Sequence, residues 1–477
     1  MKPTFFSIFI LLSFVIYAQG DQKTANMILK DSLVSRFNRR DFDGIYDLGT
    51  TPWKKKSKRE AIKEWLNYIY GLTGPVLESK EYKQLAGASY YKWTGTRKTM
   101  SFSLKDSGGL FSDFNFTFLQ EPVPAAEMKK MPTDNPLKSS LDSAVNVITT
   151  SFMVYNRLVG VSIGIVKDGK TYLYDYGTTE KGKQRLPGSH EVYELASITK
   201  AFTGILVAQA VIDKKFRLQD DCRKWLDGVF PNLAYHDQPI RIVHLANHTS
   251  GLLHELPDLS AYTSSFDVLK MYDSYTDQKF FDDLRKVTTH TVPGATYQYS
   301  NVGFKLLGII LERVYKMSYA KLVEKYITRP FGMKDTRPSL AISDTTSYMK
   351  GYDENGLVMP HNNFNMFGGS GALLSTSADM VSFIRHNISE KDPAIALSHQ
   401  QTFGTSAQGI GLGWNINYGK YGKMVWKDGG ALGFRSYCIV VPALRTGIVW
   451  LANKSGLGDE LGMMIDELLD AVLKFSQ

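Results

Sequence analysis

The segment EVYELASITKAFTGILVAQAVI, residues 191–212, constrains the possible folds of this chain more than any other segment does. Its apolar residues recur at about helical spacing after Ser197, which predicts a packed helix that opens at this serine. Lys200 follows three positions later, and side chains with this separation lie on the same side of a helix, about 5–6 Å apart at Cβ. A desolvated lysine can lose its proton near neutral pH and act as a base for a serine hydroxyl. The helix start also offers N–H groups and a positive dipole end to an oxyanion.

The S-x-x-K spacing is weak evidence by itself, because it occurs four times in the chain. The other three pairs are Ser89/Lys92, Ser318/Lys321 and Ser347/Lys350. Ser89 lies in an aromatic, strand-like segment, and the remaining two pairs have no supporting motif nearby. Ser197 follows a short apolar stretch and opens an apolar helix, so it is the candidate nucleophile.

Two further segments supply groups that a Ser–Lys pair needs. In Tyr299-Ser300-Asn301, before an apolar helix, the tyrosine can relay a proton if neighbouring lysines lower its pKa from about 10, and Asn301 can hydrogen-bond a substrate amide. Lys427-Asp428-Gly429-Gly430 leads into a strand, where Lys427 can anchor a carboxylate and Gly429 and its neighbour admit an extended substrate. Taken singly, these patterns are typical of a turn before a helix and of a hairpin turn. Together with Ser197, in this order, they predict a site.

From about Asp134 to the end, the chain resembles the serine β-lactamase and penicillin-binding-protein superfamily, in its class C-like branch. The family's S-x-x-K, Y-x-N and K-T-G elements fall on Ser197/Lys200, Tyr299/Asn301 and Lys427/Gly429. The segment from His248 to Gly251 and the Gly-rich stretch from Gly368 are similar to supporting segments of that family. The branch contains esterases, D-aminopeptidases and D-Ala-D-Ala carboxypeptidases as well as β-lactamases.

The resemblance implies an α+β fold, in which an antiparallel sheet is sandwiched by helices beside a helical lobe. It also implies that Ser197 attacks an ester or amide and forms an acyl-enzyme. Lys200, Tyr299 or the pair would act as base and later as acid, and the motifs leave this choice open. The backbone N–H groups of Ser197 and Gly430 are the candidates for the oxyanion hole.

The chain departs from the family at Asp428, which stands where the third element has threonine or serine. The hydroxyl that would help hold a β-lactam carboxylate is therefore missing. We expect D-amino-acid peptides or short acyl esters to be better substrates than β-lactams. A true β-lactamase and a non-catalytic sensor that binds peptidoglycan or β-lactams are the alternatives.

Other patterns have simpler interpretations. Asp106-Ser107-Gly108-Gly109 resembles a chymotrypsin-type nucleophile motif but lies between two alternating apolar runs, which predicts a hairpin turn. His244, His248 and His254 lack the carboxylate of a H-E-x-x-H zinc pattern, so we expect no metal site, and the resemblance makes His248 a turn-stabilising residue. The chain has neither a G-x-S-x-G elbow nor a Gly-rich phosphate loop, and we expect no cofactor.

Residues 1–20 have the pattern of a cleaved secretory signal, with Lys2, an apolar stretch from Phe5 to Val15 and a small-residue cleavage region. The apolar stretch is too short to span a membrane well, and no later stretch approaches transmembrane length, so we expect a secreted or periplasmic protein that does not span the membrane. The net charge of +9 becomes +8 without Lys2. We expect the basic cluster at residues 54–59 to be a solvated loop and helix start, and no nucleic-acid partner.

With 477 residues, 43% of them hydrophobic, the chain is expected to form two domains. Residues 21–120 predict a small α+β domain, weakly similar to cystatin-like cone folds, with helices at 24–37, 41–48 and 59–70 before its strands. Residues 121–137 form a Pro-rich linker, and 138–477 the hydrolase domain. The small domain would suit docking to a second copy of itself or to an envelope surface, and a simple folding aid is the equal alternative.

Cys222 and Cys438 are expected to be buried free thiols.

Overall fold

The computed structural model describes residues 27–475, except 58, 86–87, 98, 119–125, 127–129, 260–261, 263–264, 340–345, 362–365 and 420. The predicted signal segment, residues 1–20, therefore lies outside the described residues. Contacts divide the chain into two compact units, Met1–Glu121 and Pro122–Gln477. No helix of the described part of the chain is both long and apolar enough to cross a membrane.

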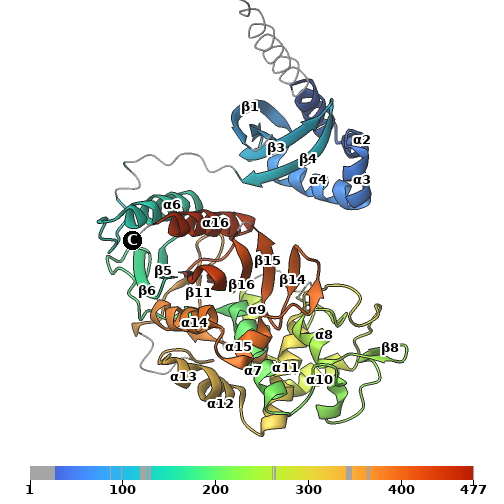
Figure 1. Ribbon diagram of the computed structural model, residues 1–477, viewed down its shortest axis with the longest axis vertical. Coiled ribbons are helices and arrows are strands. Elements are labelled where there is room, and N and C mark those ends of the chain that lie inside the picture. The colour runs from blue at the N-terminus through green and yellow to red at the C-terminus, as the bar shows by residue number, and fades with distance from the viewer. Residues whose placement is uncertain are drawn as a thin grey trace, which may run out of the picture. The chain divides into compact units, whose positions relative to one another are not determined.

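The first unit packs helices against one four-stranded antiparallel sheet (Figure 1). Its helices are 27–38, α2 Phe42–Asp47, α3 Thr51–Lys56 and α4 Arg59–Thr73, and its strands, adjacent in chain order, are β1 Val76–Leu85, β2 Ala88–Gly95, β3 Thr99–Ser107 and β4 Leu110–Phe118. The core is aromatic: the ring centroid of Trp93 lies 5.3 Å from that of Phe37 and 4.4 Å from that of Phe102. Gly108 and Gly109 form the turn between β3 and β4, which confirms the hairpin prediction for this segment.

The second unit is built on an eight-stranded antiparallel sheet with the order β13-β14-β15-β16-β17-β18-β5-β6. These strands are β5 Gly160–Lys167, β6 Lys170–Gly177, β13 Phe403–Gly404, β14 Gln408–Ile410, β15 Asn415–Gly419, β16 Gly422–Gly430, β17 Arg435–Val441 and β18 Thr446–Ala452. Strand β5, from the start of the unit, pairs with β18, from its end, so that Ile163 lies opposite Trp450. Asp168 and Gly169 join β5 to β6 with φ of 49° and 82°, as a two-residue hairpin turn requires.

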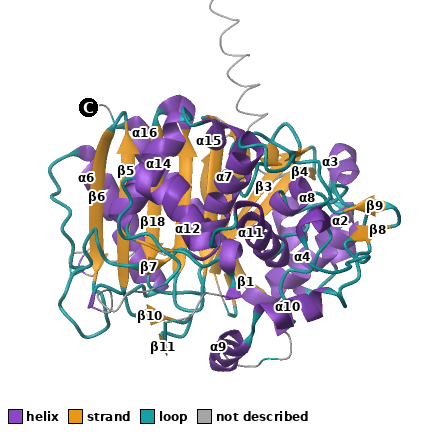
Figure 2. Ribbon diagram, turned by 90° about the horizontal axis from the view of Figure 1, so that it is seen from below, coloured by secondary structure: helices purple, strands orange, loops and turns teal. Residues whose placement is uncertain are grey.

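Helices cover both faces of this sheet, as Figures 1 and 2 show. On one face, α6 Ser140–Asn156 and α16 Asp459–Lys474 share a core with Ile163 and Ile165 of β5. On the other face lies α14 Ser377–Ser389, and a Cβ on Gly164 would come within 2.5 Å of Val381 Cγ2 of that helix. The glycine therefore lets α14 approach the sheet closely. The fold is the α+β sandwich that the sequence predicts.

A helical lobe completes the second unit. It contains α7 Thr199–Ile212, α8 Ile242–Ala246, α9 Ser265–Ser274, α10 Asp277–Leu284, α11 Asn301–Tyr315, α12 Tyr319–Val323, α13 Arg329–Phe331 and α15 Pro393–Ser398. Short strand pairs connect these helices: β7 Tyr193–Glu194 with β12 Leu374–Ser375, β8 Ala234–Tyr235 with β9 Gln238–Pro239, and β10 Gly351–Tyr352 with β11 Val358–Met359. Helix α7 is buried over most of its length and packs against α11 and α15. Cys222 and Cys438 are both buried and free, as expected.

The C-terminal end of the predicted linker packs on β6. The Gly177 N–H donates to the Pro132 carbonyl oxygen over 2.8 Å, and the Asp175 N–H donates to Asp134 Oδ1 over 2.7 Å. Asn135 Nδ2 also donates to Tyr176 Oη over 2.7 Å. Residues 132–135 are therefore a structural part of the second unit, because they form hydrogen bonds with backbone and side-chain groups of the edge strand β6.

Candidate active site

Ser197 lies in a single 3₁₀ turn, Ala196–Ile198, directly before α7. The residue before it, Ala196, has φ of 48°, a conformation that non-glycine residues seldom adopt. Such local strain is common where a reactive side chain must be presented. The serine thus stands one turn ahead of the α-helix that the sequence predicts to begin at it.

Lys200 is fully buried, and its amine contacts three oxygen atoms. Nζ lies 2.9 Å from Ser197 Oγ, 2.6 Å from Asn301 Oδ1 and 2.6 Å from the Ser370 carbonyl oxygen. Burial lowers the pKa of Lys200 well below its usual range, and the charge of Lys427 lowers it further. A neutral amine fits these contacts: its two N–H groups can serve the two carbonyl oxygens, and its lone pair can accept the Ser197 proton.

Tyr299 approaches the serine from the other side. Its hydroxyl donates to Ser197 Oγ over 2.7 Å. Burial raises the pKa of Tyr299, and the charge of Asp428 adds to this, whereas the hydrogen bond with Ser197 opposes it. The sequence-based hypothesis that lysine charges lower this pKa is therefore wrong, because desolvation outweighs them although the amines of Lys200 and Lys427 lie 5.0 Å and 4.9 Å from the ring centroid.

The position of Tyr299 is set by the start of α11 and by His248. Ser300 caps the helix: its Oγ accepts from the Gly303 N–H over 3.0 Å and donates to the Leu253 carbonyl oxygen over 2.7 Å. The His248 ring stacks on Tyr299 with centroids 4.4 Å apart, and its Nδ1 accepts from the Ser300 N–H over 3.1 Å. The turn-stabilising part that the resemblance implies for His248 agrees with these contacts.

Strand β16 forms the third wall of the site. The segment Lys427-Asp428-Gly429-Gly430 is the end of this strand, so the interpretation as a hairpin turn is wrong. It leads into strand β17, with which it pairs. Two adjacent glycines suggest a turn, but Gly429 instead allows β16 to pack closely against the Ser197 turn. A Cβ on Gly429 would lie 2.2 Å from the Leu195 carbonyl oxygen and 2.9 Å from the Ser197 nitrogen. The missing side chain brings the strand against the Ser197 turn.

Lys427 and Asp428 differ in their surroundings. Lys427 is buried and its amine lies over the Tyr299 ring, and burial lowers its pKa while the charge of Asp428 opposes this. Asp428 Oδ2 forms an ion pair with Arg435 Nη2 over 2.8 Å. The acid that replaces the family's hydroxyl residue is thus neutralised by a cation on the neighbouring strand.

Comparisons with known proteins give the family. A family described as Beta-lactamase matches residues 147–473, about two thirds of the chain. The chain belongs to the β-lactamase family.

Curated relatives within this family are distant. Protein flp from Staphylococcus aureus (strain N315) is 29% identical over 310 residues, which cover 62% of this chain and 60% of that relative. The D-alanyl-D-alanine-carboxypeptidase/endopeptidase AmpH from Escherichia coli (strain K12) is 27% identical over 336 residues, which cover 66% of this chain and 85% of AmpH. A solved structure described as a Beta-Lactamase/D-Alanine Carboxypeptidase from Pseudomonas syringae has a TM-score of 0.60 at 22% identity, covers 70% of this chain and 99% of its own, and shows the shared fold.

The β-lactamase-family site of this chain opens into a cavity of about 310 Å³ beside Ser197. Its wall includes Asn301, Gly430 and the aromatic rings of Tyr272 and Phe367. It also includes Glu255, a half-buried residue whose Oε2 accepts from Asn301 Nδ2 over 2.6 Å. Asn301 thus connects Lys200 with Glu255, whereas the sequence suggested only that it binds a substrate amide.

Sequence reasoning missed Glu255, Ser370 and Arg435. Ser370 contributes only a backbone carbonyl, and the signal for it is the Gly-rich stretch from Gly368, which forms a 3₁₀ turn beside Lys200. Glu255 follows His254 in an irregular loop that has no periodicity, so no pattern marks it. Within the described residues, no group of three or more histidines, cysteines or acids could hold a metal ion.

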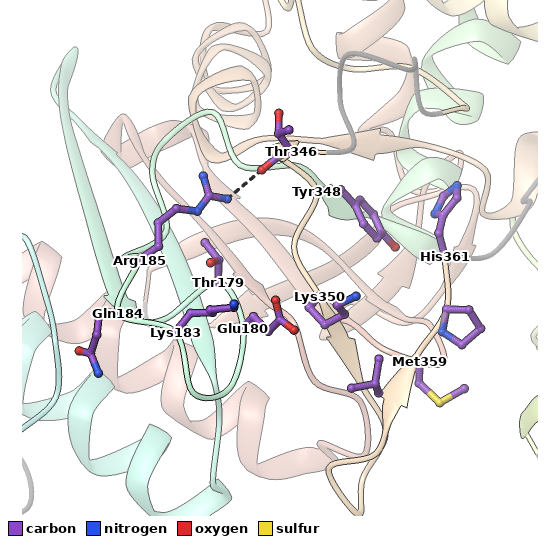
Figure 3. Close-up of a pocket in the computed structure, with 12 residues that line it drawn as sticks. Thr179, Glu180, Lys183, Gln184, Arg185, Thr346, Tyr348, Lys350, Met359 and His361 are labelled. Atoms are coloured by element: carbon purple, nitrogen blue, oxygen red, sulfur yellow. Dashed lines mark hydrogen bonds between the residues drawn. The ribbon is translucent and has the colours of Figure 1, made fainter.

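A larger cavity, of about 800 Å³, lies elsewhere in the second unit and lacks the candidate catalytic residues (Figure 3). Lys183, Arg185, Lys350 and His361 line it, with Glu180 as the acid among its lining residues. Arg185 is engaged: its guanidinium pairs with Glu191 and donates to the Thr346 carbonyl oxygen over 3.0 Å. Among the described residues that line this cavity, none forms a Ser–Lys pair like that of Ser197 and Lys200, so the smaller cavity is the candidate active site.

Proposed function

We propose that this protein is an exported serine hydrolase that cleaves an ester or amide through an acyl-enzyme on Ser197. The observation that carries this proposal is the contact of Ser197 Oγ with both Lys200 Nζ, at 2.9 Å, and Tyr299 Oη, at 2.7 Å. A nucleophile within hydrogen-bond reach of a base, itself held by further groups, is the arrangement that covalent catalysis requires. Export rests on the signal pattern of residues 1–20.

In acylation, the Ser197 hydroxyl proton passes to the Lys200 amine as Oγ forms a bond with the substrate carbonyl carbon. The carbonyl oxygen becomes an oxyanion, for which the backbone N–H groups of Ser197 and Gly430 are the proposed donors. When the tetrahedral intermediate collapses, the bond to the leaving group breaks and that group takes a proton through Tyr299. Water then attacks the acyl-enzyme in the reverse order of proton transfers and releases Ser197.

The pKa directions support a division of work between Lys200 and Tyr299. A lysine with a lowered pKa has a free lone pair near neutral pH, whereas a tyrosine with a raised pKa keeps its proton. We therefore assign the base to Lys200 and the proton relay to Tyr299, the choice that the motifs left open.

D-amino-acid peptides and short acyl esters are the proposed substrates, ahead of β-lactams. Asp428 offers no hydroxyl to a β-lactam carboxylate, and its own carboxylate is already paired with Arg435. AmpH, the relative with the larger covered share, is named for action on D-alanyl-D-alanine. Lys427 and Gly429, near the end of the strand, are the proposed binding region for the leaving part of such a substrate.

The test compares Ser197→Ala with Ser347→Ala, a matched change in another S-x-x-K pair. We expect Ser197→Ala to lower kcat on a p-nitrophenyl ester by about a thousandfold or more and to abolish fluorophosphonate labelling, and Ser347→Ala to leave both unchanged. Normal turnover and labelling in Ser197→Ala would overturn the proposal. Faster hydrolysis of nitrocefin than of the ester by the unmodified protein would favour a true β-lactamase.

A non-catalytic sensor is the second candidate, because binding without turnover uses the same cleft. Intact mass spectrometry after exposure to a β-lactam separates the two functions. A stable adduct on Ser197 without release supports the sensor, whereas an adduct that disappears with time supports the hydrolase.

A further inference from the structure

Glu255 is a carboxyl in the Ser197 cavity that the proposed reaction steps do not use. Among the described residues that line this cavity it is the only acid, and no lysine or arginine is in the lining. The remaining wall is largely apolar or backbone, with the Tyr272 and Phe367 rings 4.7 Å apart at their centroids. A ligand in this cavity therefore meets a single charged group.

The contacts of Glu255 leave one oxygen for a ligand. Oε2 accepts from Asn301, and the structure gives no hydrogen bond to Oε1 and no ion pair to this carboxyl within the described residues. The two nearest lysines are held elsewhere. Lys200 contacts Ser197, Asn301 and Ser370, and Lys305 contacts Asp277 and the Met366 carbonyl oxygen.

The carboxyl lacks a cation in contact, which makes its ionised form costly. Burial raises the pKa of Glu255 to about 7, while the Asn301 hydrogen bond and the charges of Lys200 and Lys305 lower it. A cation that entered the cavity would favour the ionised form and gain a charge-assisted hydrogen bond.

The lining of the cavity indicates which part of the substrate would reach Glu255. In the proposed mechanism Tyr299 and Lys427 handle the leaving group, and neither is among the described residues that line this cavity. Glu255 and Asn301 line it together with Ser197, the residue that takes up the acyl group. We therefore assign this cavity to the acyl part of the substrate.

We propose that Glu255 binds a protonated amine on the acyl part, so that the site selects acyl groups with a free α-ammonium, such as an N-terminal D-amino acid. This inference rests on the proposed hydrolase function and defines its substrate class. Neutral acyl groups of the same size would leave the carboxyl without a partner.

The first experiment compares two substrates that differ in one group, D-alanine p-nitroanilide and the (R)-2-hydroxypropanoyl p-nitroanilide, in which a hydroxyl replaces the ammonium. We expect kcat/KM of the unmodified protein to favour the amine about tenfold or more. In Glu255→Gln, which keeps an oxygen for Asn301, this ratio should fall toward one. Glu324→Gln, which removes an exposed carboxylate paired with Arg329, should keep the ratio of the unmodified protein. An equal kcat/KM for both substrates in the unmodified protein, or an unchanged ratio in Glu255→Gln, would overturn the inference.

The second experiment needs no turnover and keeps Glu255 intact. In Ser197→Ala, thermal unfolding is measured with D-alaninamide and with the neutral (R)-lactamide at equal concentration and ionic strength. We expect D-alaninamide to raise Tm and (R)-lactamide to leave it unchanged, because a ligand that binds only the folded state stabilises it. Stabilisation without any hydrolysis by the unmodified protein would contradict the proposed function and retain the amine site. Ester hydrolysis by Ser197 without stabilisation by the amine would contradict the amine site alone.

Discussion

Among single residues, Lys200 is the one whose chemistry depends most on what surrounds it. Its amine is buried among one hydroxyl and two carbonyl oxygens, and the cation Lys427 lies nearby. None of the described carboxylates contacts it directly, since Asn301 stands between Lys200 and Glu255. The same lysine on a solvated helix would remain protonated near neutral pH.

This environment predicts the pH dependence of the reaction. Lys200 must be neutral to accept a proton, so kcat/KM should fall as the pH decreases through its lowered pKa and reach a plateau above it. Lys427→Met removes a neighbouring positive charge, which makes protonated Lys200 less costly and should move the acidic limb to higher pH. Lys200→Ala should lower kcat by about a thousandfold or more.

The measurement is kcat/KM on a p-nitrophenyl ester across the pH range in which the protein stays folded. Lys183→Met, which changes a lysine of the larger cavity, is the control and should leave the limb in place. A limb that stays or moves to lower pH in Lys427→Met would contradict the assignment of the base to Lys200.

Among the elements, strand β16 depends on one glycine for its contact with the Ser197 turn. In Gly429→Ala the new methyl group would lie 2.2 Å from the Leu195 carbonyl oxygen, so the strand or the turn must move. A displacement of about 1 Å in a catalytic site can lower the rate about a hundredfold. We expect a loss of that order in kcat/KM, with the far-ultraviolet circular dichroism unchanged. Gly419→Ala on β15, where the Cβ would have an ordinary 3.6 Å contact with Met424, should retain activity, and equal activity in both variants would refute the argument.

The β5–β6 hairpin buries a carboxyl that makes stability depend on pH. Asp175 accepts a hydrogen bond from Ser162, and burial raises its pKa from 3.8 to about 7. Because the folded state holds this proton more tightly than the unfolded state, the free energy of unfolding should fall as the pH rises from about 4 through 7. Asp175→Asn removes this dependence. Relative to the unmodified protein, it should therefore gain stability between pH 5 and pH 8.5, by at most about 3 kcal/mol. Urea unfolding at both values tests this, and an equal difference at the two pH values would contradict it.

At the scale of the whole molecule, the division into two units can be tested by truncating the chain. Every proposed catalytic residue lies in the second unit, Pro122–Gln477. We expect a variant that starts at Lys130 to fold and to hydrolyse a small ester at the rate of the full chain, while any self-association seen by size-exclusion chromatography is lost.

A second truncation tests the contacts before α6. A variant that starts at Lys138 loses the hydrogen bonds of Pro132, Asp134 and Asn135 with β6, and should unfold at a lower temperature than the longer one. If the variant from Lys130 is folded but inactive, the first unit shapes the active site and the two units do not act separately.

The sequence by itself determined the family and much of the fold. The apolar spacing after Ser197 and the alternation around Asp168 specify a helix and a hairpin, because the buried face of each element repeats with its own period. The motifs at Ser197, Tyr299 and Lys427 identified the family, because three short patterns in a fixed order can be recognised in the sequence without a structure.

Only the tertiary structure decided the directions of the pKa shifts and the contacts between distant segments. Desolvation depends on every group that packs around a site, so the raised pKa of Tyr299 and the lowered pKa of Lys200 have no signature in the residues beside them. Gly429 appears as part of a turn until the Leu195 carbonyl oxygen is seen against it. Glu255 belongs to no motif and becomes part of the site because the loop before α9 folds back onto Asn301 at the start of α11.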